Sequence, residues 1–143
     1  MNRYKEVLNP PLSFISFLIF MYISLAFAIW AAFDFFQALA TMALLLATIP
    51  FIWRKQRMVI SIGDELRVDR AHIELNYLKD PKVVDKNEYK ALRSFKSDAR
   101  SFHATRPWIK EGVKVSVNDE RDQTTYWLIG SKHASELAKA LTN

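Results

Sequence analysis

The three histidines are the first side chains from which metal or acid–base chemistry would be expected, but their spacing supports neither. His72, His103 and His133 lie on separate predicted elements, without the HxxxH or HxxE spacing that brings metal ligands to one helix face. The chain of 143 residues has no cysteine, which excludes thiolate catalysis, disulfides and cysteine zinc sites. It also has no G-x-S-x-G motif and no glycine-rich phosphate loop. We therefore expect no enzyme, no cofactor and no metal.

The second half of the chain holds the densest group of residues suited to binding a partner. These residues combine arginine, aspartate and large aromatic side chains on neighbouring predicted strands and turns: Arg106, Trp108, Asp119, Asp122, Tyr126 and Trp127. Arginine and aromatic side chains give the largest contributions at protein interfaces. Since neighbouring residues of a strand point to opposite faces, we expect either Tyr126 or Trp127 to face out of the core.

The same cluster has a structural interpretation, which the sequence favours. In a hairpin Arg106 would lie near enough to pair with Asp119 or Asp122, and charged pairs beside bulky aromatics commonly close a small β-domain. Three lysines nearby in sequence are candidates for facing the bilayer, namely Lys110, Lys114 and Lys132. Each would contribute at most about 1 kcal/mol of attraction to anionic lipid. A protein is therefore the expected partner, with anionic lipid as a weak additional contact.

A long apolar stretch precedes these residues and must anchor them. Leu12 to Trp53 contains a single formal charge, Asp34. A hydrocarbon core about 30 Å thick is crossed by about 20 apolar residues in a helix, so the stretch predicts two spans, at about 12–32 and 35–53. Asp34 fits the N-cap of the second helix, with Gln37 completing a capping box. Residues 1–57 are thus predicted to form a juxtamembrane segment and a transmembrane helical hairpin.

Cations flank both ends of the predicted hairpin, and the turn between the helices has none. The flanking cations are Arg3 and Lys5 before the first span and Arg54, Lys55 and Arg57 after the second. The positive-inside rule then predicts a multi-pass protein of the cell membrane with both termini in the cytoplasm. A cleavable signal peptide ending near Ala28 is the disfavoured alternative, because the apolar run continues through Ala32. Both interpretations leave the following domain in the cytoplasm.

Residues 58–143 change to short alternating runs typical of β-structure. Strands are expected at 58–62, 65–69, 71–76, 82–84, 101–108, 112–118 and 124–130, with helices at 87–95 and 134–141. This spacing predicts a small, mostly antiparallel barrel or sandwich with a C-terminal helix, similar to a pleckstrin-homology domain. The net charge of +5 suits a domain beside an anionic leaflet. No aromatic–basic repeat points to nucleic acid.

Four short motifs follow one another in the second part of the chain. They are Gly63-Asp64-Glu65-Leu66-Arg67-Val68, Arg106-Pro107-Trp108, Gly112-Val113-Lys114-Val115 and Tyr126-Trp127-Leu128-Ile129. With the two predicted spans, this order resembles a family of small actinobacterial two-span membrane proteins classed as a domain of unknown function. The resemblance covers nearly the whole chain and implies a membrane location, but no activity, cofactor or substrate.

We therefore expect a membrane-anchored cytoplasmic module that binds or recruits a partner. One alternative is an accessory subunit of a larger membrane complex, which would dock through its helices. The other is a membrane-proximal enzyme, for which the sequence offers no catalytic group.

Overall fold

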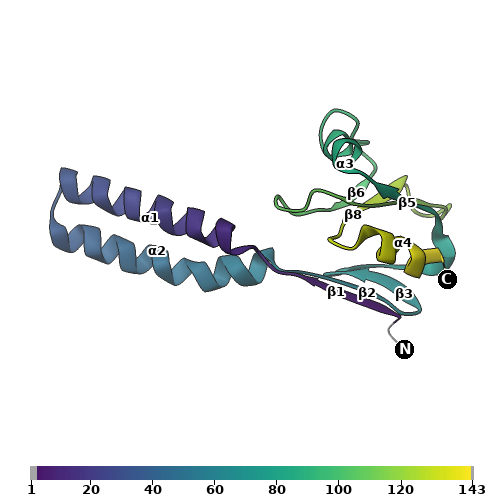
Figure 1. Cartoon of the computed structure of the whole chain (residues 1–143), viewed down its shortest axis with the longest axis horizontal. Helices are drawn as coiled ribbons and strands as arrows, with labels where there is room; N and C mark the ends of the chain where they lie inside the picture. The colour runs from purple at the N-terminus through teal and green to yellow at the C-terminus, as the bar shows by residue number, and fades with distance from the viewer. Residues whose placement is uncertain (1–2, 143) are drawn as a thin grey trace. The chain divides into compact units, whose positions relative to one another are not determined.

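The computed structural model describes residues 3–142, and within them the chain divides into two compact units (Figure 1). Asn9–Arg57 forms the first unit, which consists of two helices. The strands and helices on either side of this segment together form the second unit, a domain of β-strands and two short helices.

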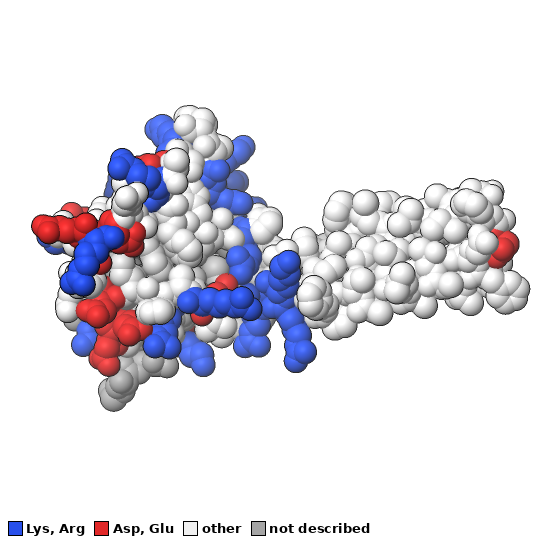
Figure 2. All heavy atoms as spheres, turned by 180° about the vertical axis from the view of Figure 1, so that it is seen from behind, with Lys and Arg blue, Asp and Glu red and all other residues white. Residues whose placement is uncertain are grey.

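The first unit confirms the prediction of two apolar helices. Helix α1 spans Leu12–Ala32 and helix α2 spans Phe35–Gln56, and both are long and apolar enough to cross a membrane. Asp34 caps α2 as expected, because its Oδ1 accepts a hydrogen bond of 2.9 Å from the Gln37 backbone N–H. The helices carry large apolar side chains on their outer surface; Leu44, for example, is 71% exposed. Figure 2 shows their surface as uncharged along most of its length.

Four antiparallel strands form the first sheet of the domain. In spatial order they are β1 (Tyr4–Leu8), β2 (Met58–Ile62), β3 (Glu65–Val68) and β4 (Ala71–Glu74). The pairing of β1 with β2 runs from Tyr4 opposite Ile62 to Leu8 opposite Met58. The juxtamembrane segment predicted before the first helix therefore contains a strand, β1. The strand that precedes the helices is part of the domain that follows them.

The second sheet has four strands, and its order is β5 (Leu78–Val84), β7 (Gly112–Val117), β8 (Tyr126–Gly130) and β6 (Phe102–Ala104). A 3-10 turn at Leu75–Tyr77 leads from the first sheet into β5. The short strand predicted at 82–84 is the end of a longer one, because β5 continues through Asp80-Pro81 with a bulge, where Asp80 takes a φ of 50°. The strand predicted at 101–108 is reduced to β6, which pairs with β8 in parallel.

Two helices complete the domain, and one of them is shorter than predicted. Helix α3 spans Lys86–Leu92 and helix α4 spans Ala134–Thr142. Asp85 caps α3, because its Oδ1 accepts from the Glu88 N–H at 2.8 Å. The predicted helix extended to residue 95, whereas Phe95 follows the end of α3 and is 81% exposed.

One hydrophobic core joins the two sheets and α4. Met58, Ile60 and Leu66 of the first sheet are fully buried in the same cluster as Val113 and Leu128 of the second. Leu137 of α4 belongs to this cluster too, and in Figure 1 α4 lies between the sheets. The described strands thus form two separate sheets, not the closed barrel that was one predicted form. The likeness to a pleckstrin-homology domain stays a prediction.

A buried carboxylate ties β1 to the turn before α4. Glu6 is 8% exposed, and its Oε2 accepts hydrogen bonds from the Ser131 hydroxyl at 2.6 Å and from the Tyr4 hydroxyl at 2.8 Å. Its Oε1 accepts from the Lys132 N–H at 3.0 Å, and His133 Nδ1 lies 3.5 Å from the same oxygen. Burial, and after it the bond to Glu6, raises the pKa of Tyr4. The carboxylate therefore satisfies donors at the start of α4.

Replacement of Glu6 by alanine should destabilise the domain. The Glu6→Ala chain leaves the fully buried Ser131 hydroxyl without its acceptor, so we expect a loss of about 1–3 kcal/mol in the free energy of unfolding. This loss is measured by urea unfolding of the full chain in neutral detergent, with tryptophan fluorescence as the signal. The control is Glu74→Ala, which removes an exposed carboxylate from β4 and should change stability by less than about 0.5 kcal/mol. Equal losses in the two variants would contradict the role of Glu6.

Candidate binding site

Arg106 makes an ion pair across the two sheets, with a partner that the sequence did not indicate. Its Nη2 lies 2.9 Å from Oδ2 of Asp69, which stands in the turn between β3 and β4. Asp69 also accepts from the Val59 N–H at 2.9 Å through its other oxygen, and its φ is 55°. The predicted pairing of Arg106 with Asp119 or Asp122 was therefore wrong. An arginine–aspartate clasp is present, but it joins the first sheet to the loop after β6.

Asp119 and Asp122 shape the turn between β7 and β8. Asp119 Oδ1 accepts from the Arg121 N–H, and Asp122 Oδ1 accepts from the Thr124 N–H, both at 2.9 Å. The Thr124 hydroxyl donates to the same Asp122 oxygen at 2.7 Å, and these bonds lower the pKa of the Asp122 carboxyl. Both aspartates thus hold local turn structure, as aspartate commonly does.

Tyr126 and Trp127 are both buried, which corrects the expectation that one of them faces outward. Tyr126 is 7% and Trp127 is 5% exposed, because β8 lies inside its sheet and is covered on both faces. The Trp127 ring lies 4.4 Å from that of Phe102, measured between centroids. The Tyr126 hydroxyl accepts a long bond of 3.4 Å from the Asp98 N–H. Neither aromatic side chain offers the exposed area that a binding surface requires.

The three predicted lipid-facing lysines separate into two places. Lys114 places its Nζ 4.4 Å from the centroid of the Tyr126 ring, in a cation–π contact. Lys110 and Lys132 are exposed and line one hollow of about 420 Å³, together with the half-buried Trp108. Trp108 is thus a member of the predicted binding cluster that lines an open hollow.

A second and larger hollow of about 570 Å³ adjoins this one beside α3. The two hollows share Lys86, Ile109 and Lys110 in their walls, and the larger one adds Lys90 and Arg93. The larger hollow has no carboxylate in its lining, and the smaller one has only Glu111. We call the two together the α3 hollow. Cations therefore dominate a concave surface that is open to solvent.

A local pattern in the sequence indicates part of this hollow, although the sequence analysis did not predict it. Lys86, Lys90 and Arg93 are spaced i, i+4, i+7, which places them on one face of a helix. Lys110 and Lys132 join that face only through the tertiary structure, because the loop before β7 and the turn before α4 come alongside it.

Tyr89 packs the other side of α3 against the second sheet. The side chain is 2% exposed, and its ring lies against Gly112 and Gly130, which face each other on β7 and β8. A Cβ on Gly130 would stand 2.5 Å from the Tyr89 hydroxyl and 3.0 Å from Ile109, so glycine is required there. Within the described residues this hydroxyl is buried without a hydrogen-bond partner. Burial raises the pKa of Tyr89 to about 12, with Arg93 acting against it, so the hydroxyl stays protonated at neutral pH.

The histidines do not gather, and across residues 3–142 the structure groups no three side chains suited to holding a metal. His103 Nε2 lies 2.6 Å from the Ser101 hydroxyl, a pairing that in a hydrolase would activate the serine. The Ser101 hydroxyl, however, donates its one hydrogen to the Asp98 carbonyl at 2.6 Å. The Ser101 oxygen must therefore accept a hydrogen bond from His103 Nε2. The contact thus holds a turn together and does not activate the serine.

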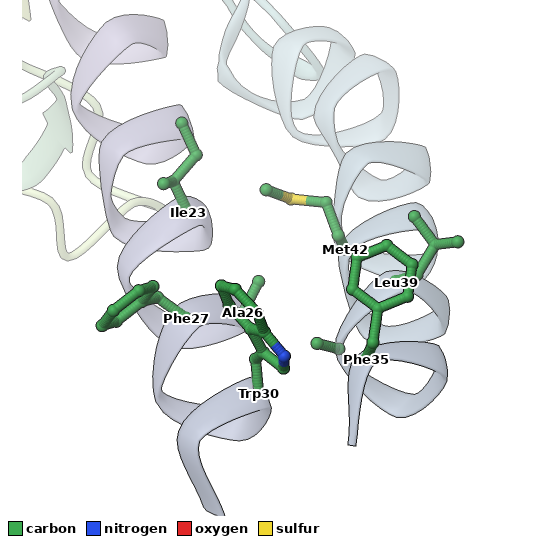
Figure 3. A pocket seen from close by; sticks show the side chains of 8 residues that line it. Ile23, Ala26, Phe27, Trp30, Phe35, Leu39 and Met42 are labelled. Atoms are coloured by element: carbon green, nitrogen blue, oxygen red, sulfur yellow. The ribbon is translucent and has the colours of Figure 1, made fainter. Parts of the chain in front are cut away.

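The helical unit has an apolar hollow of its own, of about 240 Å³ (Figure 3). Its lining comes from both helices and is entirely apolar: Ile23, Ala26, Phe27, Trp30, Phe35, Ala38, Leu39 and Met42. Figure 3 shows Trp30 and Met42 extending into the space between the helices. Outside the hollow, a hydrogen bond of 2.9 Å between the Tyr22 and Thr48 hydroxyls joins α1 to α2.

The Arg106–Asp69 pair should couple the stabilities of its two residues. We expect a double-mutant cycle of Arg106→Ala and Asp69→Asn to give a coupling of about 1 kcal/mol, as for partly exposed ion pairs. Asparagine keeps the oxygen that accepts from Val59 and tolerates the positive φ, so it removes the charge alone. Urea unfolding of the four chains gives the coupling energy. A value of zero within error would show that the ion pair adds no stability.

Comparison with known proteins confirms one part of the resemblance noted in the sequence, the classification as a domain of unknown function. Residues 3–141 match the family described as "Protein of unknown function (DUF3093)". No curated protein matches the chain, and no solved structure does. The match covers both helices and all of the described domain except Thr142, and it includes β1. The chain therefore belongs to this family of proteins of unknown function.

Proposed function

We propose that this protein is a two-span membrane anchor that presents a small β-domain at the cytoplasmic face, where the domain acts as a binding module. The main observation that supports this proposal is the pairing of β1 with β2, which stand immediately before and after the two helices. A chain that leaves a sheet at Leu8 and returns to the same sheet at Met58 must cross a bilayer an even number of times. Both ends of the helical hairpin then lie on one side.

The charges support the cytoplasm as that side. Arg54 and Lys55 lie in the last turn of α2, whereas the turn between the helices carries only Asp34. The structure also argues against the signal-peptide alternative. Cleavage near Ala28 would remove β1 and with it Glu6, the buried carboxylate that satisfies donors at the start of α4.

The binding function is placed at the α3 hollow rather than at Tyr126 and Trp127, which are buried. The hollow is concave, open and strongly charged, and Trp108 and Lys110 line it. Clefts lined by charges of one sign concentrate ligands of the opposite sign. An adaptor that holds a ligand or partner at the membrane needs such a surface together with an anchor.

A second candidate is an accessory subunit of a larger membrane complex. It is favoured by the apolar hollow between α1 and α2, which would accept a side chain from another transmembrane helix. The two candidates differ in which unit makes the essential contact.

The topology is tested by labelling introduced cysteines, since the natural chain has none. In intact cells a membrane-impermeant maleimide should label the Phe33→Cys chain and should leave Lys5→Cys and Ser135→Cys unlabelled. All three positions are exposed in the structure, so all three should react after the membrane is opened. Labelling of Ser135→Cys in intact cells would place the domain outside and overturn the proposal.

Exchange of the helices separates the two candidates. Residues 12–56 are replaced by an unrelated two-span hairpin, which keeps β1 and β2 and thus allows them to pair. A binding module should then co-purify the same partner molecules from mild detergent as the natural chain. An accessory subunit should lose them, because its contacts were made by the replaced helices. The urea transition of the domain serves as the control that it remains folded.

A further inference from the structure

The cations of the α3 hollow have no acidic partners among the described residues. The ion pairs elsewhere in the domain are Lys82–Glu88, Arg67–Glu65, Arg100–Asp98, Arg106–Asp69 and His133–Glu6. The five cations that line the hollow occur in none of them: Lys86, Lys90, Arg93, Lys110 and Lys132. On the face seen in Figure 2 the acidic side chains of the domain gather toward one edge, and Lys and Arg predominate along the opposite one. Like charges around one concavity repel each other, and a bound anion would relieve that repulsion.

The lining of the hollow limits the class of anion that it could hold. Lys86, Lys90, Arg93 and Lys110 line the larger hollow. Tyr89 is part of the same wall, but its hydroxyl is buried against Gly130 and is therefore not available to a ligand. An oxygen-rich anion with several acceptors is the ligand class that suits lysines and an arginine together.

An exposed aromatic side chain beside the hollow indicates where that anion comes from. Phe95 stands in the turn after α3 and is 81% exposed, with Arg93 and Lys96 close to it in the chain. A bare aromatic ring next to cations is the arrangement that enters a lipid interface, where the ring is buried among acyl chains and the cations meet headgroups. A free phosphate ion would give Phe95 nothing to contact. This favours a phosphate that is part of a membrane surface.

We propose that the α3 hollow binds the phosphate of an anionic glycerophospholipid headgroup, with Phe95 inserted into the same leaflet. Lys86, Lys90 and Arg93 contact the phosphate from α3, and Lys110 contacts it from the loop before β7. The inference rests on the proposed function, since an anchored domain meets headgroups at high effective concentration. Only Asn9, Pro10 and Pro11 on one side, and Arg57 on the other, join the domain to the helices. The headgroup would then hold the domain against the bilayer.

The test uses the full chain in lipid nanodiscs with an environment-sensitive fluorophore on Ser97→Cys. This position is exposed, lies two residues from Phe95, and gives a single label because the chain has no cysteine. The probe emission should rise as phosphatidylglycerol replaces phosphatidylcholine. The triple variant Lys86→Gln/Lys90→Gln/Arg93→Gln should need at least about 10-fold more anionic lipid for the same response, since each cation contributes up to about 5-fold.

The matched control removes three exposed cations that do not line the hollow, in Lys79→Gln/Arg121→Gln/Lys139→Gln. It should respond like the parent, although its net charge equals that of the first triple variant. Salt gives a second measurement without mutation, because 0.5 M sodium chloride should suppress the response of the parent chain. Equal loss in both triple variants would show a general charge effect and overturn the site.

Two further measurements complete the test. One distinguishes binding of a lipid headgroup from binding of free phosphate, and the other detects a failure of membrane insertion. Inorganic phosphate or glycerophosphate at 1 mM should not displace the probe from anionic nanodiscs; displacement would overturn the assignment to a membrane headgroup. Co-elution of the chain with nanodiscs reports membrane insertion independently of the probe. A chain that does not co-elute contradicts the proposed function, whereas a chain that co-elutes without responding to anionic lipid contradicts this inference alone.

Discussion

The pairing of β1 with β2 is the constraint on which the rest of the structure depends. The two strands are separated in sequence by both helices, yet they match residue for residue from Tyr4 opposite Ile62 to Leu8 opposite Met58. Because side chains alternate along a strand, this register turns Glu6 and Leu8 toward the core. A shift of one residue would bury Lys5 and Val7 instead and expose the carboxylate. The Glu6 bonds to Ser131 and Lys132 then join the beginning of the domain to its last helix.

Cover on both faces of the second sheet explains why Tyr126 and Trp127 are not exposed, as a binding surface would require. Every residue of β8 is buried, since the common core lies on one face and Tyr89 and its helix lie on the other. A strand in that position uses its aromatic side chains for packing. The hollows that remain open lie farther out, at the charged face of α3 and the loop that contains Trp108 and Lys110.

The two units combine into one physical argument about function. An apolar pair of helices with exposed side chains has no stable place in water, and insertion into a bilayer removes that surface from water. Under the proposed function, such insertion would keep the domain near the headgroups, where a concave group of cations without acidic partners would have its strongest effect. The anchor and the α3 hollow are thus consistent with a single role at the membrane surface.

By itself the sequence determined the features that depend on local patterns. The apolar run from Leu12, the Asp34 cap, most of the strands and the apolar stripe of α4 were readable because each rests on spacing within a few residues. Tertiary structure alone decided the place of β1, the partner of Arg106, the burial of both Tyr126 and Trp127, and the gathering of Lys110 and Lys132 beside α3. Each of these four features brings together residues that are far apart in the chain. Such contacts depend on strand register and on competition for the shared core, which no local window of sequence contains.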